Sequence, residues 1–564
     1  MANLNLQSLR QLLLHLVVLM VLFYLYARLI EGVGGFTTEF IRFQWLEFSL
    51  IAYLYGLLYL ALRPGRWRIL LAALPILLLY LIHDAFFLVY GKVIRLANLS
   101  EVPELLQILS PMYSMLLVVL IVTPLVLIAR NLEYRRFRRI TVALAPLLLL
   151  GIVLKSSPAA FASSFETLAH NIVKYSDAKS VENNGRLAML LYHEAQRTMT
   201  LAAIAPYRER NEYDARYRNR IAQLQRRITP RNVHLIVLES FLDPRLFRKL
   251  KFSRSPVHPD FEKLFGNQLG LSRSPVFGGA TAQAEFEILC GVPALEQLSS
   301  IEFNVFTGSP AHCLPDLLGA LGYRSVAGNA YKPNFFNAQA AYAGMGFAEQ
   351  YFPIEFYAAG PTYLKTGNPG PEEYLFDADL FAQNLSFVEQ HLHRQPDTPL
   401  FNYLLTIYGH TPHVLDPEKR PPVIQTQSDF SDDHLQRAVN QFYYRTQAIA
   451  DYVQQLLRID HNSLIILISD HVPPLRYGPN TYESLSYLDN RAKSIYYNRI
   501  AVLDKGKPIR PGRLHHYDLP DLILDYLSNG KYCANQSCAW LTRTEKARET
   551  HMNEYLTLIA HASE

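Results

Sequence analysis

The distribution of apolar residues divides the chain into two parts. Residues 1 to about 155 contain five long apolar stretches, whereas the remainder alternates short apolar runs with polar segments. A helix rises about 1.5 Å per residue, so a bilayer core of about 30 Å requires about 20 residues, and several stretches need their flanks to reach that length. We predict five membrane-spanning helices. They lie at approximately Leu12–Leu29, Phe48–Leu62, Ile69–Tyr90, Tyr113–Ile128 and Ile140–Leu154.

The basic residues between these stretches predict their orientation. One set of loops contains nine Lys and Arg residues and the opposite set contains four. Because positively charged loops remain in the cytoplasm, the N-terminus is predicted to be cytoplasmic, and an odd number of spans places everything after Leu154 outside. No small-residue cleavage site follows the first stretch, so we interpret it as a membrane anchor and not as a removed signal peptide.

The charge follows the same division. The whole chain has a net charge of +5, but the first 155 residues carry +7, which leaves −2 for the rest. The basic character therefore belongs to the membrane part. The outer part has no excess of positive charge that would favour binding to nucleic acid, and we exclude that class of partner.

The outer part begins with a charged helical segment and continues as an α/β domain. The stretch Tyr207–Arg227 is rich in Arg and Tyr, which suits either a helix near lipid head groups or a solvated linker helix. After Pro230, short apolar β-branched runs alternate with helical stretches, as in a mainly parallel sheet covered by helices on both faces. The runs are Val233–Leu238, Leu400–Tyr408 and Leu464–Ile468. The predicted domains are a transmembrane domain at 1–155, a juxtamembrane helical linker at 156–229 and a catalytic domain at 230–564.

Two features of the sequence leave alternatives open. All four cysteines lie in the outer part, where we favour the disulfides Cys533–Cys538 and Cys290–Cys313, with free thiols as the alternative. His83 and Asp84 fall inside the third apolar stretch. They form either a functional site or a hydrogen-bonded pair within the helix bundle.

Polar residues follow each of the three buried runs. The first run ends in Glu239-Ser240, the second in Gly409-His410-Thr411-Pro412-His413 and the third in Ser469-Asp470-His471. Ligands of open α/β sheets bind at the carboxyl ends of the strands, where these side chains are expected to meet. The three endings supply two carboxylates and at least two imidazoles. An oxygen-rich set with one nitrogen suits Mn²⁺, Mg²⁺ or Zn²⁺ without selecting among them.

A fourth element is the segment Phe277–Glu287, in which Gly278 and Gly279 precede Thr281 and a predicted helix. Taken alone, Thr281 suits a helix N-cap better than a nucleophile. However, a helix N-terminus also binds phosphate, and a threonine hydroxyl becomes nucleophilic once a metal or a base removes its proton. Glu285 either supports this site or interacts with the helix dipole.

The motifs together resemble a known family. Leu238-Glu239-Ser240, Gly279-Ala280-Thr281 with Glu285-Phe286, His410-Thr411-Pro412 and Ser469-Asp470-His471 occur in the order found in lipoteichoic acid synthases. The phosphoglycerol transferases that act on periplasmic glucans share this order. Both belong to the sulfatase-like branch of the alkaline phosphatase superfamily, and five spans before an outer catalytic domain match the synthase architecture.

The resemblance implies a metal-dependent transfer reaction. Glu239, Thr281, Asp470 and His471 would bind one divalent ion, with Mn²⁺ as the first choice and Zn²⁺ or Mg²⁺ as alternatives. Thr281 would attack the head-group phosphate of a phospholipid donor and pass the group to a glycan or polymer acceptor, while His410 would contact the phosphate or assist the leaving oxygen. The donor would be phosphatidylglycerol or phosphatidylethanolamine. The protein would lie in the cytoplasmic membrane of a bacterium with its catalytic domain in the periplasm.

The sequence departs from the family in the substrate-binding segment. Where the synthases have a histidine, a tryptophan and an arginine, an ungapped alignment places Asn329, Phe336 and Ala338. Loss of the arginine removes a bidentate contact to phosphate or glycerol oxygens, for which Lys332 or Arg324 is the candidate replacement. The sequence therefore leaves phosphoethanolamine as a competitor to phosphoglycerol.

Two rival classes of function remain: a hydrolase of the same fold, either a sulfatase or a phosphodiesterase, and a non-catalytic scaffold. A formylglycine sulfatase requires Cys or Ser in a Cys/Ser-x-Pro-x-Arg motif, and Cys313-Leu314-Pro315-Asp316 is followed by Leu317 where the arginine belongs. A phosphodiesterase of the same fold would instead hydrolyse the intermediate. A non-catalytic scaffold is the other alternative, but it gives no reason to keep a set of buried carboxylates together.

Overall fold

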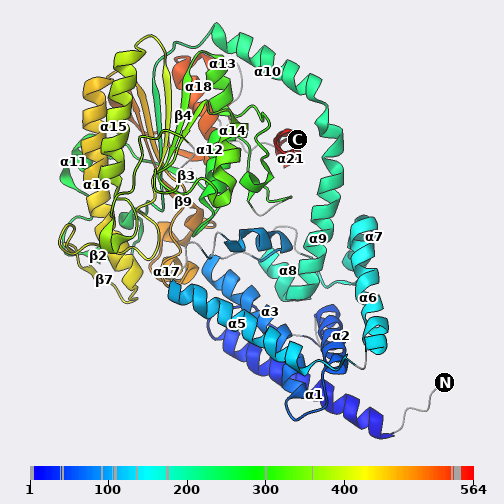
Figure 1. Cartoon of the computed structure of the whole chain (residues 1–564). Coiled ribbons are helices and arrows are strands. Elements are labelled where there is room, and N and C mark those ends of the chain that lie inside the picture. The colour runs from blue at the N-terminus through cyan, green and yellow to red at the C-terminus, as the bar shows by residue number, and fades with distance from the viewer. Residues whose placement is uncertain are drawn as a thin grey trace. The chain divides into compact units, whose positions relative to one another are not determined.

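The computed structural model describes most of the chain, in two compact units. The described residues are 6–38, 40, 44–90, 93–103, 106, 111–134, 137–172, 177–298, 301–357, 360–534, 538 and 548–564. Contacts divide the chain into Met1–Ala202 and Ala203–Glu564, a boundary that lies within the predicted linker 156–229 (Figure 1). Each unit is described by itself.

The first unit contains helices over all five predicted apolar stretches. They are α1 (Leu6–Glu31), α2 (Trp45–Ala61), α3 (Arg68–Tyr90), α5 (Pro111–Asn131) and α6 (Phe137–Ser156), followed by α7 (Pro158–Leu168), α8 (Asp177–Asn184) and α9 (Arg186–Ala203). Helix α3 contacts α1, α2 and α5, and α2 contacts α6. Among the described residues, Arg68–Leu88 is long and apolar enough to cross a membrane, and α6 with α7 forms a pair bent by 112° that qualifies together. The count of five spans is therefore not confirmed.

A cluster of buried charges fixes the start of α9 in this unit. The Arg186 guanidinium donates from Nε to Asp84 Oδ1 at 2.9 Å and lies over the Tyr80 ring. The Tyr26 hydroxyl also donates to Asp84, at 2.5 Å. Glu47 accepts hydrogen bonds from the Tyr80 hydroxyl and from three backbone N–H groups at the start of α9. We name these five residues the α9 cluster.

His83 and Asp84 do not form a pair with each other. The partners of Asp84 come from α1 and α9, outside the helix that carries it. Both ring nitrogens of His83 are buried, and the described part of the chain offers them no hydrogen bond. The predicted hydrogen-bonded pair of His83 and Asp84 is therefore not formed. Asp84 is hydrogen-bonded within the first unit, but its partners are Tyr26 and Arg186.

The second unit is built on a nine-stranded, mainly parallel sheet. The strand order is β11-β3-β9-β8-β1-β6-β4-β5, with β10 beside β9. Strands β8, β1, β6, β4 and β5 are parallel, and β9 runs antiparallel to both β8 and β3. The bounds are β1 (Val233–Leu238), β3 (Gly270–Arg273), β4 (Arg324–Asn329), β5 (Glu349–Tyr351), β6 (Leu400–Leu405), β8 (Leu464–Ser469), β9 (Tyr497–Asp504), β10 (Lys507–Ile509) and β11 (Arg513–His515).

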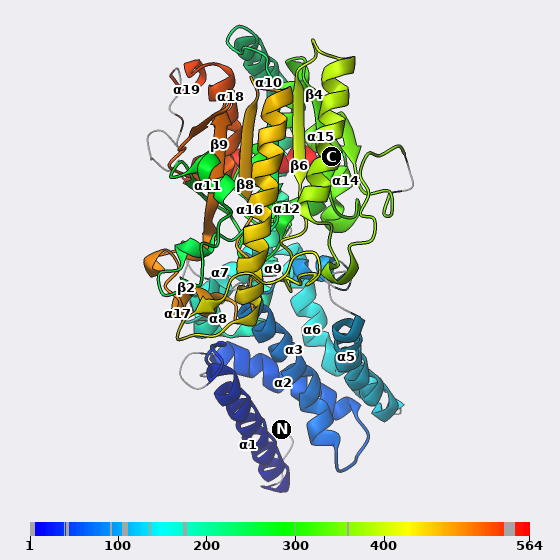
Figure 2. The same ribbon diagram turned by 90° about the vertical axis from the view of Figure 1, so that its left-hand side faces the viewer.

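Helices cover both faces of the sheet (Figures 1 and 2). Successive residues of β1 point to opposite faces, so Val237 packs in one core and Ile236 in the other. The first core contains α12 (Thr281–Cys290), α13 (Leu314–Ala320), α14 (Ala338–Met345), α18 (Leu519–Leu527) and α21 (Arg548–Ala562), and the second contains α11 (Pro259–Phe265), α15 (Asp377–Arg394) and α16 (Asp433–Ile459). The α/β prediction is confirmed.

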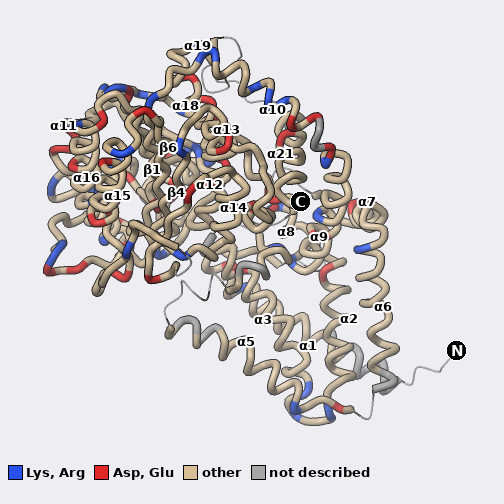
Figure 3. Tube along the Cα trace, turned by 45° about the horizontal axis from the view of Figure 1, so that its top comes forward, with Lys and Arg blue, Asp and Glu red and all other residues tan. Residues whose placement is uncertain are grey.

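The remaining elements lie outside these layers. They are α10 (Arg210–Gln225), α17 (Pro479–Ser484), α19 (Lys531–Ala534) and the two-stranded sheet of β2 (Lys251–Phe252) and β7 (Thr426–Gln427). Both favoured disulfides, Cys290–Cys313 and Cys533–Cys538, are formed. Basic and acidic residues are interspersed over the second unit, whereas long parts of the helices α1 to α3 carry neither (Figure 3).

Candidate active site

The carboxyl ends of two neighbouring strands bring three predicted ligands together. Glu239 directly follows β1, and Asp470 and His471 directly follow β8, its hydrogen-bonded neighbour. All three side chains are buried, and one ligand atom of each lies within 4.8 Å of the others. In the described residues this is the one such group of at least three metal-binding side chains.

Thr281 brings its hydroxyl to the same place. It is the first residue of α12, and its Oγ1 donates a hydrogen bond to Glu239 Oε2 at 2.9 Å and lies 3.4 Å from His471 Nε2. The N-cap position belongs instead to Ala280, which has left-handed backbone angles and no capping side chain. The N-cap interpretation of Thr281 is therefore wrong, because its hydroxyl points to the carboxylate and not to the backbone of its helix.

The backbone at Gly409 approaches the site too closely for any side chain. A Cβ at this position would lie 1.9 Å from the carbonyl oxygen of Glu239 and 2.2 Å from Arg445 Nη1. Glycine therefore allows the end of β6, with His410, to run directly beside the end of β1.

The charges of the three buried ligands are not balanced. Burial raises the pKa of the Asp470 carboxyl well above its usual value, and the neighbouring Glu239 carboxylate raises it further. Burial also acts to raise the pKa of Glu239, but the facing His471 and then His410 outweigh it and lower that pKa. Two carboxylates held this close favour an additional cation.

The hydrogen bonds of Asp470 support the same conclusion. Its Oδ1 accepts from the backbone N–H groups of Ser240 at 2.7 Å and His471 at 2.6 Å. Its Oδ2 is buried, accepts no hydrogen bond and lies 3.2 Å from His471 Nε2. One orphaned carboxylate oxygen beside a second carboxylate and an imidazole fits the donor set of a divalent metal ion.

Several supporting residues could not be identified from the sequence. Arg445, in the middle of α16, donates from Nη1 to the carbonyl oxygen of Glu239 at 2.8 Å and from Nε to Asp377 at 2.7 Å. His516 Nε2 donates to the carbonyl oxygen of Asp470 at 2.9 Å, and burial lowers the pKa of this imidazole to about 3. Arg445 and His516 carry no local signal, because only the packing of α16 and of the segment after β11 brings them here.

His410 and His413 have different environments although they share one loop. His410 is half-buried, its ring lies 5.1 Å from that of Tyr374, and its Nδ1 donates to the carbonyl oxygen of Thr411 at 2.9 Å. His413 is fully buried, and burial lowers the pKa of its imidazole to about 3. Of the two, His410 is the side chain that a substrate could reach.

The predicted substrate residues lie at the carboxyl end of β4, where Asn329 is the last residue of the strand and Lys332 and Phe336 follow it. Asn329 is buried, donating from Nδ2 to the Tyr342 hydroxyl at 2.9 Å and accepting from the backbone N–H of Tyr331 at 2.8 Å. Phe336 is half-buried, with its ring 4.3 Å from that of Phe335. The Lys332 ammonium lies 5.3 Å from the centre of the Tyr331 ring. Asn329 is therefore engaged in hydrogen bonds within the protein, whereas Lys332 is half-buried and its ammonium lies over an aromatic ring.

Arg324 cannot replace the missing arginine. It begins β4 and therefore lies at the opposite, amino edge of the sheet. Its guanidinium forms two hydrogen bonds with Glu349, at 2.6 and 2.8 Å. The hypothesis that Arg324 grips the substrate is wrong, because position along the strand separates it from the catalytic edge.

Glu285 supports the site from one helical turn beyond Thr281. Its Oε1 accepts hydrogen bonds from the hydroxyls of Tyr342 and Tyr403, both at 2.5 Å. Burial raises the pKa of this carboxyl to about 7. Because the Tyr342 hydroxyl also accepts from Asn329, Glu285 connects α12 to the end of β4, and its role is this network rather than a response to the helix dipole.

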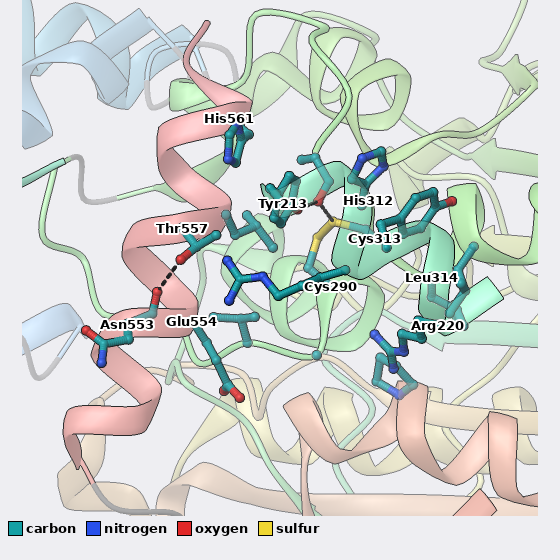
Figure 4. A pocket seen from close by; sticks show the side chains of 18 of the residues that line it. Tyr213, Arg220, Cys290, His312, Cys313, Leu314, Asn553, Glu554, Thr557 and His561 are labelled. Carbon is teal, nitrogen blue, oxygen red and sulfur yellow. Dashed lines mark hydrogen bonds between the residues drawn. A yellow bond between two sulfur atoms is a disulfide. The ribbon is translucent and has the colours of Figure 1, made fainter. Parts of the chain in front are cut away.

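A cavity of about 1000 Å³ lies at the other end of α12 (Figure 4). Its walls are α10, α21 and the Cys290–Cys313 disulfide. His312 is held there by Asp316 at 2.7 Å and Asp214 at 3.0 Å, and its ring stacks on those of Tyr213 and Tyr217. At about 1.5 Å per residue, ten-residue α12 separates this cavity from Thr281 by about 14 Å, so it is not the site of the chemistry.

The second unit is similar in sequence to a known protein family and to individual proteins. The sulfatase family model matches residues 231–513, about half of the chain. A protein of Rhizobium meliloti (strain 1021), described as "Putative cyclic beta-1,2-glucan modification protein", is 28% identical over 266 residues, which cover 46% of this chain. The alignment spans 37% of the length of that relative.

Solved structures with a similar fold have low sequence identity. A phosphoglycerol transferase of Streptococcus pyogenes, GacH in complex with sn-glycerol-1-phosphate, is 17% identical with a TM-score of 0.47, covering 64% of this chain and 92% of that one. The lipoteichoic acid synthase LtaP of Listeria monocytogenes is 16% identical with a TM-score of 0.42, covering 55% and 78%. The assignment therefore rests on the family model, and by that match the chain belongs to the sulfatase family.

Proposed function

We propose that this protein is a membrane-anchored, metal-dependent transferase that moves a phospholipid head group to an envelope glycan or polymer through a phosphothreonine at Thr281. The observation that carries the proposal is the hydrogen bond from Thr281 Oγ1 to Glu239, beside the orphaned oxygen of Asp470. A structural threonine at a helix start would cap the helix instead of turning to a buried carboxylate. The head group is phosphoglycerol or phosphoethanolamine.

Some residues of the site would bind the metal ion and the phosphate, and others would transfer protons. Glu239, Thr281, Asp470 and His471 would hold one divalent ion, which lowers the pKa of the threonine hydroxyl and neutralises phosphate charge. Mn²⁺, Zn²⁺ and Mg²⁺ all suit this donor set. Thr281 is the first residue of α12, and the N-terminus of a helix favours an anion beside it.

The proposed reaction has two steps. Thr281 Oγ1 attacks the phosphorus of the donor, its proton passes to Glu239, and the bond from phosphorus to the diacylglycerol oxygen breaks. His410, at the open side of the site, contacts the phosphate or donates the proton that the leaving oxygen takes up. In the second step an acceptor hydroxyl attacks the same phosphorus and gives its proton to His410. The bond from phosphorus to Thr281 Oγ1 breaks, and this oxygen takes back the proton from Glu239, so that neither water nor a redox partner is consumed.

The remaining parts of the chain support a membrane location. The five apolar helices at residues 1–155 are proposed as a transmembrane domain, 156–229 as a juxtamembrane linker and 230–564 as the periplasmic catalytic domain of a bacterial inner-membrane protein. Lys332 and Phe336 are proposed substrate contacts, with Asn329 behind them. The glucan in the description of the Rhizobium meliloti relative supports a glycan acceptor.

The disulfides disfavour a formylglycine sulfatase. Conversion to formylglycine requires a free cysteine or a serine in the motif, and Cys313, the one candidate from the sequence, is bonded to Cys290. Phosphodiester hydrolysis remains the competing activity, because water could attack the same phosphothreonine.

Mass spectrometry of the Thr281 peptide tests the proposal. Full-length protein is incubated with phosphatidylglycerol or phosphatidylethanolamine vesicles without acceptor and then quenched in acid. We expect one of the two head groups, as a phosphodiester, on Thr281 and diacylglycerol in the lipid fraction. Absence of any adduct in a preparation that still turns over lipid would contradict the covalent route, and rapid release of the free head group would identify a hydrolase.

A further inference from the structure

The second unit has few exposed large apolar side chains, and they lie in loops that follow the carboxyl ends of two strands. Among the described residues of Ala203–Glu564 they are Ile354, 62% exposed, Phe356, 37% exposed, and Tyr477, 47% exposed. Single exposed apolar residues are normally scattered over a protein surface. Here, however, Ile354 and Phe356 follow the carboxyl end of β5, and Tyr477 lies in the loop after the carboxyl end of β8.

These positions lie on both sides of the candidate active site. In the sheet, β5 and β8 are separated by β4, β6 and β1. At about 4.8 Å between neighbouring strands, the two loops start about 19 Å apart. His410 follows β6 and Glu239 follows β1, so these two groups lie between the starts of the two loops, while Asp470 and His471 stand at the start of the loop that carries Tyr477. Figure 2 shows the helix after Tyr477, α17, beyond the end of the sheet at which β8 finishes.

Aromatic rings and a cation connect the outer side chains to the site. The rings of Phe356 and Tyr331 lie 5.9 Å apart, and the Lys332 ammonium lies 5.8 Å from the centre of the Phe356 ring. Tyr374 packs against His410 with ring centres 5.1 Å apart. We name Ile354, Phe356, Tyr477, Tyr331 and Lys332 the apolar rim.

We propose that the apolar rim inserts into the surface of a lipid bilayer and thereby brings Thr281 to the head groups of its donor. The occupant is a bilayer interface, because aromatic rings with a lysine are the side chains that favour the boundary between head groups and acyl chains. The same chain contains a helix long and apolar enough to cross a membrane, and the proposed transmembrane domain would keep a bilayer close to the rim. This inference rests on the proposed function for the identity of the donor, but the insertion can be measured without turnover.

The rim explains how the half-buried Thr281 hydroxyl would reach a lipid phosphate. The head-group phosphate of a phospholipid lies at the depth at which interfacial aromatic residues settle. Two apolar loops at opposite sides of the site would hold its opening against that layer, so that the donor moves a short distance out of the bilayer without leaving it entirely. A soluble phosphodiester would need none of these contacts.

Fluorescence quenching tests the insertion itself. Ile354→Trp is prepared in the full-length protein in nanodiscs with and without brominated phosphatidylglycerol, and the signal of the three native tryptophans is corrected with the unmodified protein. The matched control is Gln395→Trp, an exposed position in the loop before β6, at the amino edge of the sheet. We expect bromine to quench Ile354→Trp and to leave Gln395→Trp unchanged. Equal quenching of the two, or of neither, overturns the proposal.

Kinetics with a lipid donor and a soluble donor test whether the insertion helps the enzyme to use lipid. Ile354→Asp should raise the KM for phosphatidylglycerol in vesicles roughly tenfold, because a charged side chain replaces an apolar one that insertion would bury in the bilayer. Its kcat/KM for soluble bis-(p-nitrophenyl) phosphate should remain unchanged, and Gln395→Asp should alter neither value. An equal loss with both donors would mean that the rim serves the site or a protein partner, and would overturn the proposal. If the unmodified protein transfers no head group while Ile354→Trp is still quenched, the proposed function fails and the insertion stands.

Discussion

Two buried groups of charges, one in each unit, differ in how completely the protein satisfies them. In the α9 cluster, the Arg186 guanidinium neutralises Asp84, and the Glu47 carboxylate takes up three N–H groups and a tyrosine hydroxyl. At the catalytic edge, Glu239 and Asp470 share one imidazole, and an oxygen of Asp470 accepts no hydrogen bond.

The difference separates a structural group from a chemical one. Burying a charge is costly unless partners within the protein compensate it, and the α9 cluster meets that condition by itself. The catalytic edge lacks such compensation among the described residues, and a bound cation would supply it. Burial of charged residues therefore does not by itself indicate function, whereas an uncompensated pair of carboxylates at strand ends does.

The largest expected effect is the loss of activity in Thr281→Ala. Removing the hydroxyl removes the attacking atom, so head-group transfer should fall by at least roughly a thousandfold. The thermal midpoint of the variant should stay close to that of the unmodified protein, since the side chain is only half-buried. Thr281→Ser is the matched control and should keep measurable transfer. Transfer by Thr281→Ala at an undiminished rate would remove Thr281 as the nucleophile.

Asp470→Asn should lower the stability of the protein when metal is present, but not after the metal has been removed. With metal present, the variant loses the ion, detected by elemental analysis, and with it a stabilisation of about 2.7 kcal/mol for an ion at a hundred times its Kd. After chelation, the variant should be as stable as the chelated unmodified protein or more so, because one of two facing carboxylates is gone. The exposed Asp433→Asn serves as control. A full metal content in Asp470→Asn would contradict the ligand set.

Arg186→Met should lower the stability of the protein without changing its metal content. Loss of the guanidinium leaves Asp84 buried without its cation, which costs about 3–5 kcal/mol, while metal content and the Thr281 adduct stay normal in the protein that folds. Arg186→Met combined with Asp84→Asn should recover most of the stability, as measured by thermal unfolding in detergent. If the single and double variants unfold at the same temperature, the two charges are not coupled.

The smallest expected effect concerns His312 beside the cavity. Burial acts to lower the pKa of this imidazole, but the carboxylates of Asp316 and Asp214 outweigh it and raise that pKa above its usual value of about 6.5. The charged form therefore stabilises the fold fully below about pH 6.5, and this contribution is lost as the pH rises through the raised pKa. His312→Gln should cost about 1 kcal/mol at pH 6 and less at pH 9. The exposed His393→Gln should show no such dependence in thermal unfolding.

Local patterns in the sequence determined the elements of this protein and the residues that end them. The apolar runs before Glu239 and Asp470 became neighbouring strands, and the glycines before Thr281 preceded a helix, because strand and helix periodicity are properties of short segments. The four cysteines paired as favoured. The order of motifs also sufficed for the family.

Only the tertiary structure decided which side chains share a surface. Arg445 and His516 reach the site through the packing of distant segments, Arg324 is removed from it by its place at the other end of β4, and Asn329 is engaged by a tyrosine that no local pattern associates with it. The apolar rim joins loops more than a hundred residues apart in sequence. Such proximity depends on strand order and on the direction in which each strand runs, and neither is encoded within a single segment of the chain.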